Sequence, residues 1–204
     1  ISQFIIKCIP NYGYQFESAG GMLDSVNSDL SQFLPQEEDC TYKVTMADKN
    51  LTISGNFVET ANKEPSPVGT PQKINSVKAS GYSSSDIKSG TVEMKYLERT
   101  PEDAIKDKMD TLASSNGFLV QEYLNITLTS VVKKCQKGDK KEFWEKSITQ
   151  LTSPVTITIE LGNKLAGKGP YKVVRYHGSK AELLDAEYNE SNKTITFKTD
   201  RFRS

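Results

Sequence analysis

The sequence of 204 residues contains little of what several large classes of protein need. Its 26 lysines and arginines are balanced by 26 aspartates and glutamates, so there is no basic excess. A nucleic-acid-binding protein normally gathers such an excess on one face, and we therefore expect no nucleic acid as a partner. No segment approaches the run of about 18 apolar residues that a membrane helix needs, so we expect no membrane insertion within this chain.

Histidine is almost absent, which bears on catalysis. Serine or cysteine nucleophiles need a histidine or another base within reach, and His177 is the single histidine. No serine lies in a GxSxG motif. We therefore predict no catalytic residue and do not expect an enzyme.

Cysteine is scarce as well, with Cys8, Cys40 and Cys135 only. Their spacing contains no CxxC pair, and a single histidine is too few to complete a zinc site, so no metal site is predicted. Two alternatives remain for the thiols. Cys8 and Cys40 could form a disulfide within the first domain, or all three could be unpaired, which the odd count favours.

Glycines between residues 151 and 177 raise the question of a phosphate-binding loop. Gly162, Gly167 and Gly169 lie close together, but such a loop must open onto the N-terminus of a helix. Here Pro170 and a second strand-like run follow instead. The pattern predicts a connection between two strands, and no cofactor is expected.

Short alternating runs dominate the rest of the sequence and predict a mainly β protein. Examples are Val92, Met94 and Tyr96, then Val155, Ile157, Ile159 and Leu161, and finally Ile195 and Phe197. Tyr42 to Phe57 contains two such runs around an "ADKN" turn, which predicts a β-hairpin. The stretch between Phe16 and Cys40 is predicted to be irregular.

One helix is predicted near residues 101–115. Thr100 is a suitable N-cap and Pro101 suits the first helical position. Ile105, Met109 and Leu112 form one apolar stripe, which needs a sheet to pack on. Asn116 and Gly117 tolerate the left-handed conformation that ends a helix.

The proline-rich stretch at residues 63–71 predicts a linker, because such a composition favours extended backbone and buries little. We therefore predict a small β-rich domain at residues 1–62. A β-sandwich with one accessory helix is predicted at residues 72–204.

Exposed aromatic rings are the natural candidates for a ligand site, since a flat ring can stack on a sugar. Tyr12 and Tyr14 alternate with polar residues, and Trp144 lies in a charged segment. Each also has a structural interpretation: the tyrosines on the inner face of a sheet, and the tryptophan in the core between sheets. We name Trp144, Tyr12 and Tyr14 as the candidate ligand-binding residues.

Several motifs in the second domain resemble one known module. They are "YLNITL", "LTSPVTITIEL" and "LAGKGPYKVVRYHGSKAELLDAEYNESNKTITFKTDRF". Together they resemble a β-sandwich module found near the C-termini of large surface proteins from anaerobic Gram-positive gut bacteria. The resemblance covers roughly residues 77–202. The first domain is similar to the small β-repeats of the same proteins, through "GYQF" and "YKVTMADKNLTIS".

This resemblance implies an exported protein at the cell surface and carries over no catalytic residue. We therefore expect a non-catalytic extracellular module with a structural, stalk-like or adhesion role. It is expected to be a monomeric fragment of a larger protein whose targeting signal lies outside this chain. Its partner would be a host or cell-wall glycan or protein. The alternative is a carbohydrate-binding module of a secreted glycan-degrading protein.

Overall fold

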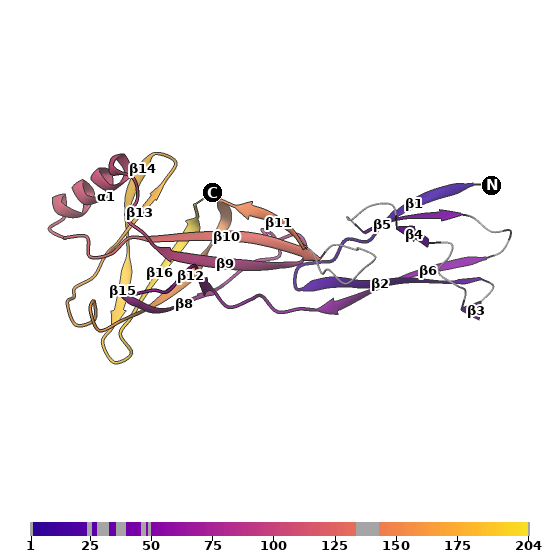
Figure 1. Cartoon of the computed structure of the whole chain (residues 1–204), viewed down its shortest axis with the longest axis horizontal. Helices are drawn as coiled ribbons and strands as arrows, with labels where there is room; N and C mark the ends of the chain where they lie inside the picture. The colour runs from indigo at the N-terminus through magenta and orange to yellow at the C-terminus, as the bar shows by residue number, and fades with distance from the viewer. Residues whose placement is uncertain are drawn as a thin grey trace. The chain divides into compact units, whose positions relative to one another are not determined.

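The computed structural model describes residues 2–23, 26–27, 33–35, 40–45, 48, 50–133 and 143–203. The protein is mainly β, with one helix in the described part (Figure 1). No described helix is both long and apolar enough to cross a membrane. The mainly β fold class predicted from the alternating runs is confirmed.

The chain forms two compact units. The first consists of Ile1–Asn62, Ile87–Val92 and Ser130–Lys146, and the second of Lys63–Asp86, Glu93–Thr129 and Ser147–Ser204. The first unit therefore includes two later segments that lie within the residues predicted as the second domain.

Two three-stranded sheets are built from the N-terminal residues. One has the order β1-β5-β4, with β1 at Gln3–Lys7, β5 at Thr41–Thr45 and β4 at Phe33–Pro35. The other has the order β3-β2-β6, with β3 at Val26–Asn27, β2 at Tyr14–Leu23 and β6 at Leu51–Glu59.

The hairpin predicted between residues 42 and 57 is wrong, although both of its strands exist. β5 pairs with β1 and β4, whereas β6 pairs along its whole length with β2. Alternation fixes which face of a strand is buried but carries no information on its partner. The stretch between Phe16 and Cys40, predicted to be irregular, instead contains most of β2, whose ten residues include Glu17 and two glycines, together with β3 and β4.

The β-sandwich consists of two four-stranded sheets. The order β11-β10-β9-β7 joins Phe143–Ile148, Leu124–Lys133, Thr91–Glu98 and Ser66–Pro67. The order β15-β16-β12-β8 joins Ala186–Asn189, Thr194–Arg201, Gln150–Leu161 and Ile74–Ser80. The predicted linker thus contains strand β7, which pairs in parallel with β9.

The core of the sandwich comes from the predicted alternating runs. From β9 and β10 it receives Met94, Tyr96 and Leu128, and from β12 and β16 it receives Val155, Ile157, Ile195 and Phe197, all of them buried. Ile157 is fully buried, and it pairs with Phe197 on one side and Ala79 on the other. Full burial of such a side chain contributes roughly 1.5–3 kcal/mol.

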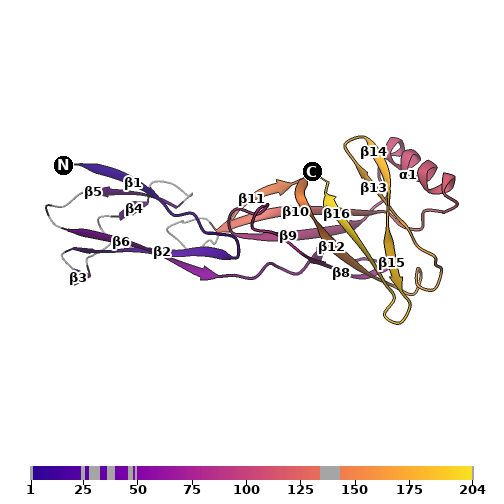
Figure 2. The same cartoon turned by 180° about the vertical axis from the view of Figure 1, so that it is seen from behind.

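A separate hairpin carries the helix. β13 at Val173–His177 pairs with β14 at Lys180–Leu184, and helix α1 at Asp103–Ser115 packs on this pair (Figures 1 and 2). The predicted helix is confirmed, as is its end, where Gly117 has a φ of +80°. Its N-cap is Glu102 rather than Thr100, because the Glu102 carbonyl accepts the first helical N–H bonds.

The glycine-rich stretch is a connection between β12 and β13, as predicted. Gly162 has a packing reason to be glycine: its N–H donates to the carbonyl of Lys73 at 2.8 Å. A Cβ at this position would lie 2.8 Å from that same oxygen, which is too close for any real side chain.

Candidate functional site

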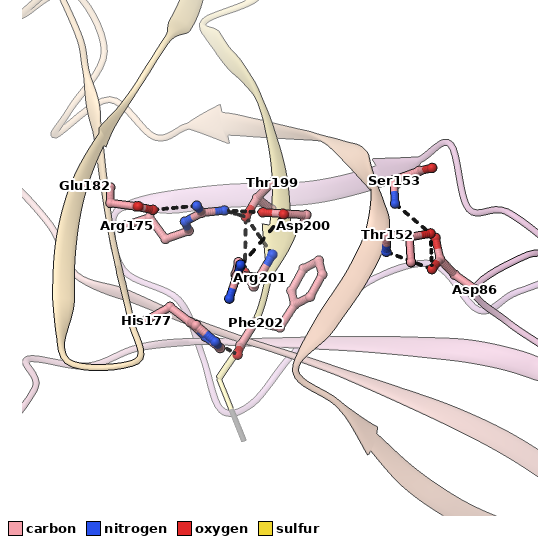
Figure 3. Close-up of polar contacts among 10 residues, drawn as sticks. All are labelled: Asp86, Thr152, Ser153, Arg175, His177, Glu182, Thr199, Asp200, Arg201 and Phe202. Carbon is pink, nitrogen blue, oxygen red and sulfur yellow. Dashed lines mark hydrogen bonds and ion pairs between the residues drawn. The ribbon is translucent and has the colours of Figure 1, made fainter.

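The largest cluster of charged side chains described in the second unit surrounds Arg175 on β13. Its Nη1 donates to Asp200 at 2.6 Å and to the Thr199 hydroxyl at 3.1 Å, and its Nη2 donates to Glu182 at 2.5 Å. Figure 3 shows the guanidinium lying between these acceptors, which come from β14 and β16. The Arg175 side chain is only 17% exposed. The cluster therefore joins the hairpin to the last strand of the sandwich.

Both carboxylates of this cluster are held in their charged form. The hydrogen bond from Arg175 and the charge of its guanidinium lower the pKa of Glu182 below its usual range. For Asp200, partial burial acts in the opposite direction, but the Arg175 hydrogen bond and nearby charges outweigh it and lower the pKa. Neither group can donate a proton near neutral pH, so the cluster is unsuited to general acid catalysis.

One atom of the cluster is incompletely satisfied. Nε of Arg175 is buried and has no hydrogen-bond partner among the described residues. Leaving such a donor unpaired is costly, and the two ion pairs of the guanidinium offset this cost.

His177 lies at the end of β13, close to the same cluster in Figure 3. Its Nδ1 lies 3.1 Å from the Phe202 carbonyl, which can only accept, so the proton is on Nδ1. This is the one hydrogen bond of the His177 side chain within the described part of the chain. A histidine that binds a backbone carbonyl in this way has a structural role, because it holds the end of β13 to the residue that follows β16.

A second polar cluster centres on Asp86. Its carboxylate accepts the N–H of Thr152 at 2.7 Å, the Thr152 hydroxyl at 2.6 Å and the N–H of Ser153 at 3.2 Å (Figure 3). These bonds attach the segment that follows β8 to the first residues of β12. The acceptor capacity of Asp86 is thus used to hold two parts of the backbone together.

Glu98, at the end of β9, binds several backbone N–H groups at once. Its carboxylate accepts three consecutive N–H groups, from Gln72 at 2.7 Å, Lys73 at 2.9 Å and Ile74 at 2.7 Å. Burial of Glu98 disfavours its charged form, but the three hydrogen bonds and the charge of Lys73 outweigh this and lower the pKa. Glu98 therefore holds the first residues of β8 against the end of β9, between the two sheets of the sandwich.

Among the described residues, an open groove of about 660 Å³ lies on the outer face of the β15-β16-β12 sheet. The residues that line it all have polar groups in their side chains: Thr158, Glu187, Tyr188, Asn189, Glu190, Ser191, Asn192, Thr194 and Thr196. Many of these groups bond to one another, as Thr158 does with Thr196 at 3.3 Å and Ser191 with Asn189 at 2.6 Å. The groove presents hydroxyl, amide and carboxylate groups and could accept a hydrophilic ligand.

The three predicted ligand-binding residues lie on different segments. Trp144 is 47% exposed on β11, and Tyr14 is 41% exposed at the start of β2, which belongs to another sheet. Tyr12 is half-buried, and its hydroxyl accepts the side-chain N–H of Asn62 at 2.7 Å. None of the three lines the groove, and nothing in the sequence had indicated the residues that do.

The cysteines do not form the Cys8–Cys40 disulfide. Cys8 is a free thiol and Cys40 is in a disulfide bond, so both alternatives are wrong, the Cys8–Cys40 pair and the set of three unpaired cysteines; Cys135 lies outside the described residues. The two residues are nonetheless neighbours, because the Cys8 N–H donates to the Cys40 carbonyl at 3.0 Å. Burial raises the pKa of the Cys8 thiol, which lowers its nucleophilicity near neutral pH.

Within the described ranges, no three histidine, cysteine, aspartate or glutamate side chains are grouped to hold a metal ion. Comparison with known family models, curated proteins and solved structures finds no match to this chain.

Proposed function

We propose that this chain is a non-catalytic module of an exported surface protein, with a structural, stalk-like or adhesion role. The observation that carries the proposal is that its partly buried charged side chains bind other parts of the same protein. Glu98, Asp86 and the Arg175–Asp200 pair each join separate segments of the second unit, and their hydrogen bonds are directed at the protein itself. Functional sites usually leave such groups directed at a ligand.

The cell-surface setting rests on the resemblance of residues 77–202 to modules of bacterial surface proteins. In that setting the chain would act as a monomer within a longer polypeptide. Its partner would be a host or cell-wall glycan or protein. Mild proteolysis of intact source cells should release peptides of this chain while a cytosolic marker stays inside. Release of both together, or of neither, would contradict the surface location.

Carbohydrate binding is the second candidate, and two observations favour it. The groove on the outer face of the sheet presents hydroxyl, amide and carboxylate groups, which suit a polyhydroxylated ligand. Trp144 is half-exposed, and a ring in this position can stack on a sugar.

A glycan array separates the structural role from carbohydrate binding. The wild-type chain would be compared with Trp144→Ala and with Thr196→Val, which removes one hydroxyl of the groove but keeps the shape of the side chain. Phe143→Ala is the matched control, because Phe143 is the exposed aromatic neighbour of Trp144 on β11. The structural role predicts no saturable binding by any of the four proteins. Saturable binding that Trp144→Ala or Thr196→Val removes and Phe143→Ala keeps would contradict it.

A further inference from the structure

Strand β12 is the shared partner of the first and last long strands of the β15-β16-β12-β8 sheet. β8 is antiparallel to β12, with Ile74 opposite Leu161 and Ser80 opposite Thr156. β16 is also antiparallel to β12, with Thr194 opposite Glu160. Two strands antiparallel to the same neighbour run parallel to each other, and both begin at the C-terminal end of β12.

The chain consequently joins this sheet at one end and leaves it at the other. Ile74, where β8 begins, is level with Leu161 at one end of β12. Arg201, where β16 ends, is opposite Gln150 at the other end of β12. A tension applied between these two points acts along the strands and draws β8 and β16 in opposite directions past β12.

We infer that the sandwich bears tension between residues 72 and 203, with β8 and β16 loaded in shear against β12; this inference rests on the structural role proposed above. The hydrogen bonds of an antiparallel pair lie perpendicular to its strands. Force along the strands therefore loads all bonds of a ladder together. Force that pulls two adjacent strand ends apart breaks the same bonds one after another, which needs less force.

The hydrogen bonds of Glu98 and the ion pair of Asp200 lie where this force would enter the sheet; each such contact is called a tie below. At the beginning of β8, Glu98 holds the N–H groups of residues 72–74, and the Lys73 carbonyl accepts the N–H of Gly162 at 2.8 Å. The Lys73 ammonium adds an ion pair with Glu122 at 2.7 Å. A force applied at residue 72 is therefore shared by the contacts with β9 and with the end of β12, in addition to the hydrogen bonds between β8 and β12.

The end of β16 is held in a similar way. Asp200 is paired with Arg175, and the N–H of Phe202 donates to Thr149 at 2.9 Å. The N–H of Arg203 donates to Ile126 of the other sheet at 3.2 Å, and the Phe202 side chain is only 4% exposed. A load at residue 203 is thereby shared between both sheets.

Single-molecule force spectroscopy of the full chain tests the inference. Handles are attached through exposed positions, either at Gln72 and Arg203 or at Gln150 and Arg203. The first pair loads β8 and β16 in shear, whereas the second peels β16 from β12 beginning at one end. We expect the rupture force at one loading rate to be several-fold higher for the first pair. Equal forces, or a higher force for the second pair, would overturn the inference.

A charge-neutralising variant tests the tie at the beginning of β8. Glu98→Gln should lower the rupture force for the Gln72 and Arg203 handles and leave the force for the Gln150 and Arg203 handles unchanged. Glu187→Gln, on the outer strand β15, is the matched control and should alter neither force. An unchanged shear force in Glu98→Gln would overturn the role of this tie. Saturable glycan binding would contradict a purely structural role without changing these forces, so the failure of that role and the failure of this inference can be told apart.

Discussion

Nη1 of Arg175 lies 2.6 Å from Oδ1 of Asp200, and this contact attaches the β13–β14 hairpin to the end of β16. The hairpin forms its own two-stranded sheet, so such contacts decide whether it stays on the sandwich. Helix α1 lies on the hairpin and depends on the same attachment.

Replacing Asp200 with asparagine should therefore destabilise the fold. The change removes the charge from a hydrogen-bonded pair while Arg175 stays partly buried. Because the Asp200 side chain is 34% exposed and solvent screens it, we expect a loss of about 1–2 kcal/mol in the free energy of unfolding. Urea denaturation measures this loss. Glu182→Gln is the control on the same guanidinium, and because its side chain is 50% exposed its loss should be smaller. A larger loss in Glu182→Gln would contradict the assignment.

The carboxyl group of Glu98 should make stability depend on acid pH. Its pKa in the folded chain lies below the ordinary value of 4.5. The stabilisation is therefore fully present above 4.5 and is lost as the pH falls through the lower folded-state pKa. Denaturation midpoints measured from neutral pH downwards should fall in this window by more in the wild type than in Glu98→Gln. Parallel pH profiles for the two proteins would show that Glu98 is not the group responsible.

The centre of the sandwich core should be sensitive to the volume of Ile157. Its side chain is fully buried on the strand that lies between β8 and β16. Ile157→Ala should cost about 2–5 kcal/mol and Ile157→Val about 0.5–1.5 kcal/mol in unfolding free energy. The exposed Lys78→Ala on β8 should stay within about 0.5 kcal/mol of wild type. Similar losses for Ile157→Ala and Lys78→Ala would place the core elsewhere.

Cys8 and Cys40 should differ in their oxidation state. Alkylation of the unfolded but unreduced chain should label Cys8, because its thiol is free, and should leave Cys40 unlabelled. After reduction, both should be labelled, as peptide mass spectrometry would reveal. Labelling of Cys40 before reduction would show that its disulfide does not form.

The alternating apolar runs predicted most of the sandwich because one face of each strand is buried. Val92, Met94 and Tyr96 are buried as expected, and so are Ile195 and Phe197. The helix was predicted for the same kind of reason, because its apolar stripe has to pack on another element. In the structure, that element is the β13–β14 hairpin.

Strand partners could not be predicted in this way. Both runs of the expected hairpin at residues 42–57 alternate correctly, but their ladders are completed by β1, β4 and β2. Pairing depends on which other strands the fold brings near, and a local turn signal competes weakly with a ten-residue neighbour.

The hydrogen bonds and ion pairs of the charged side chains could not be predicted from the sequence either. Glu98 bonds to backbone groups 24 to 26 residues earlier, and Arg175 to side chains 7 and 25 residues later. No spacing rule connects such positions. Trp144, Tyr12 and Tyr14 were predicted because their rings can stack on a sugar. This property does not predict whether the segments that contain them lie close together. Their ligand-binding role stays a prediction.

The central claim is that the partly buried charges of the sandwich act on its own fold. The most direct test is the unfolding free energy of the double variant Glu98→Gln, Asp200→Asn at neutral pH. These two residues share no bonding partner in the described structure, so we predict a loss close to the sum of the two single losses. Groups kept for binding or catalysis commonly cost stability, and replacing them leaves a protein as stable or more so. A double variant as stable as the wild type, or more stable, would therefore contradict the account.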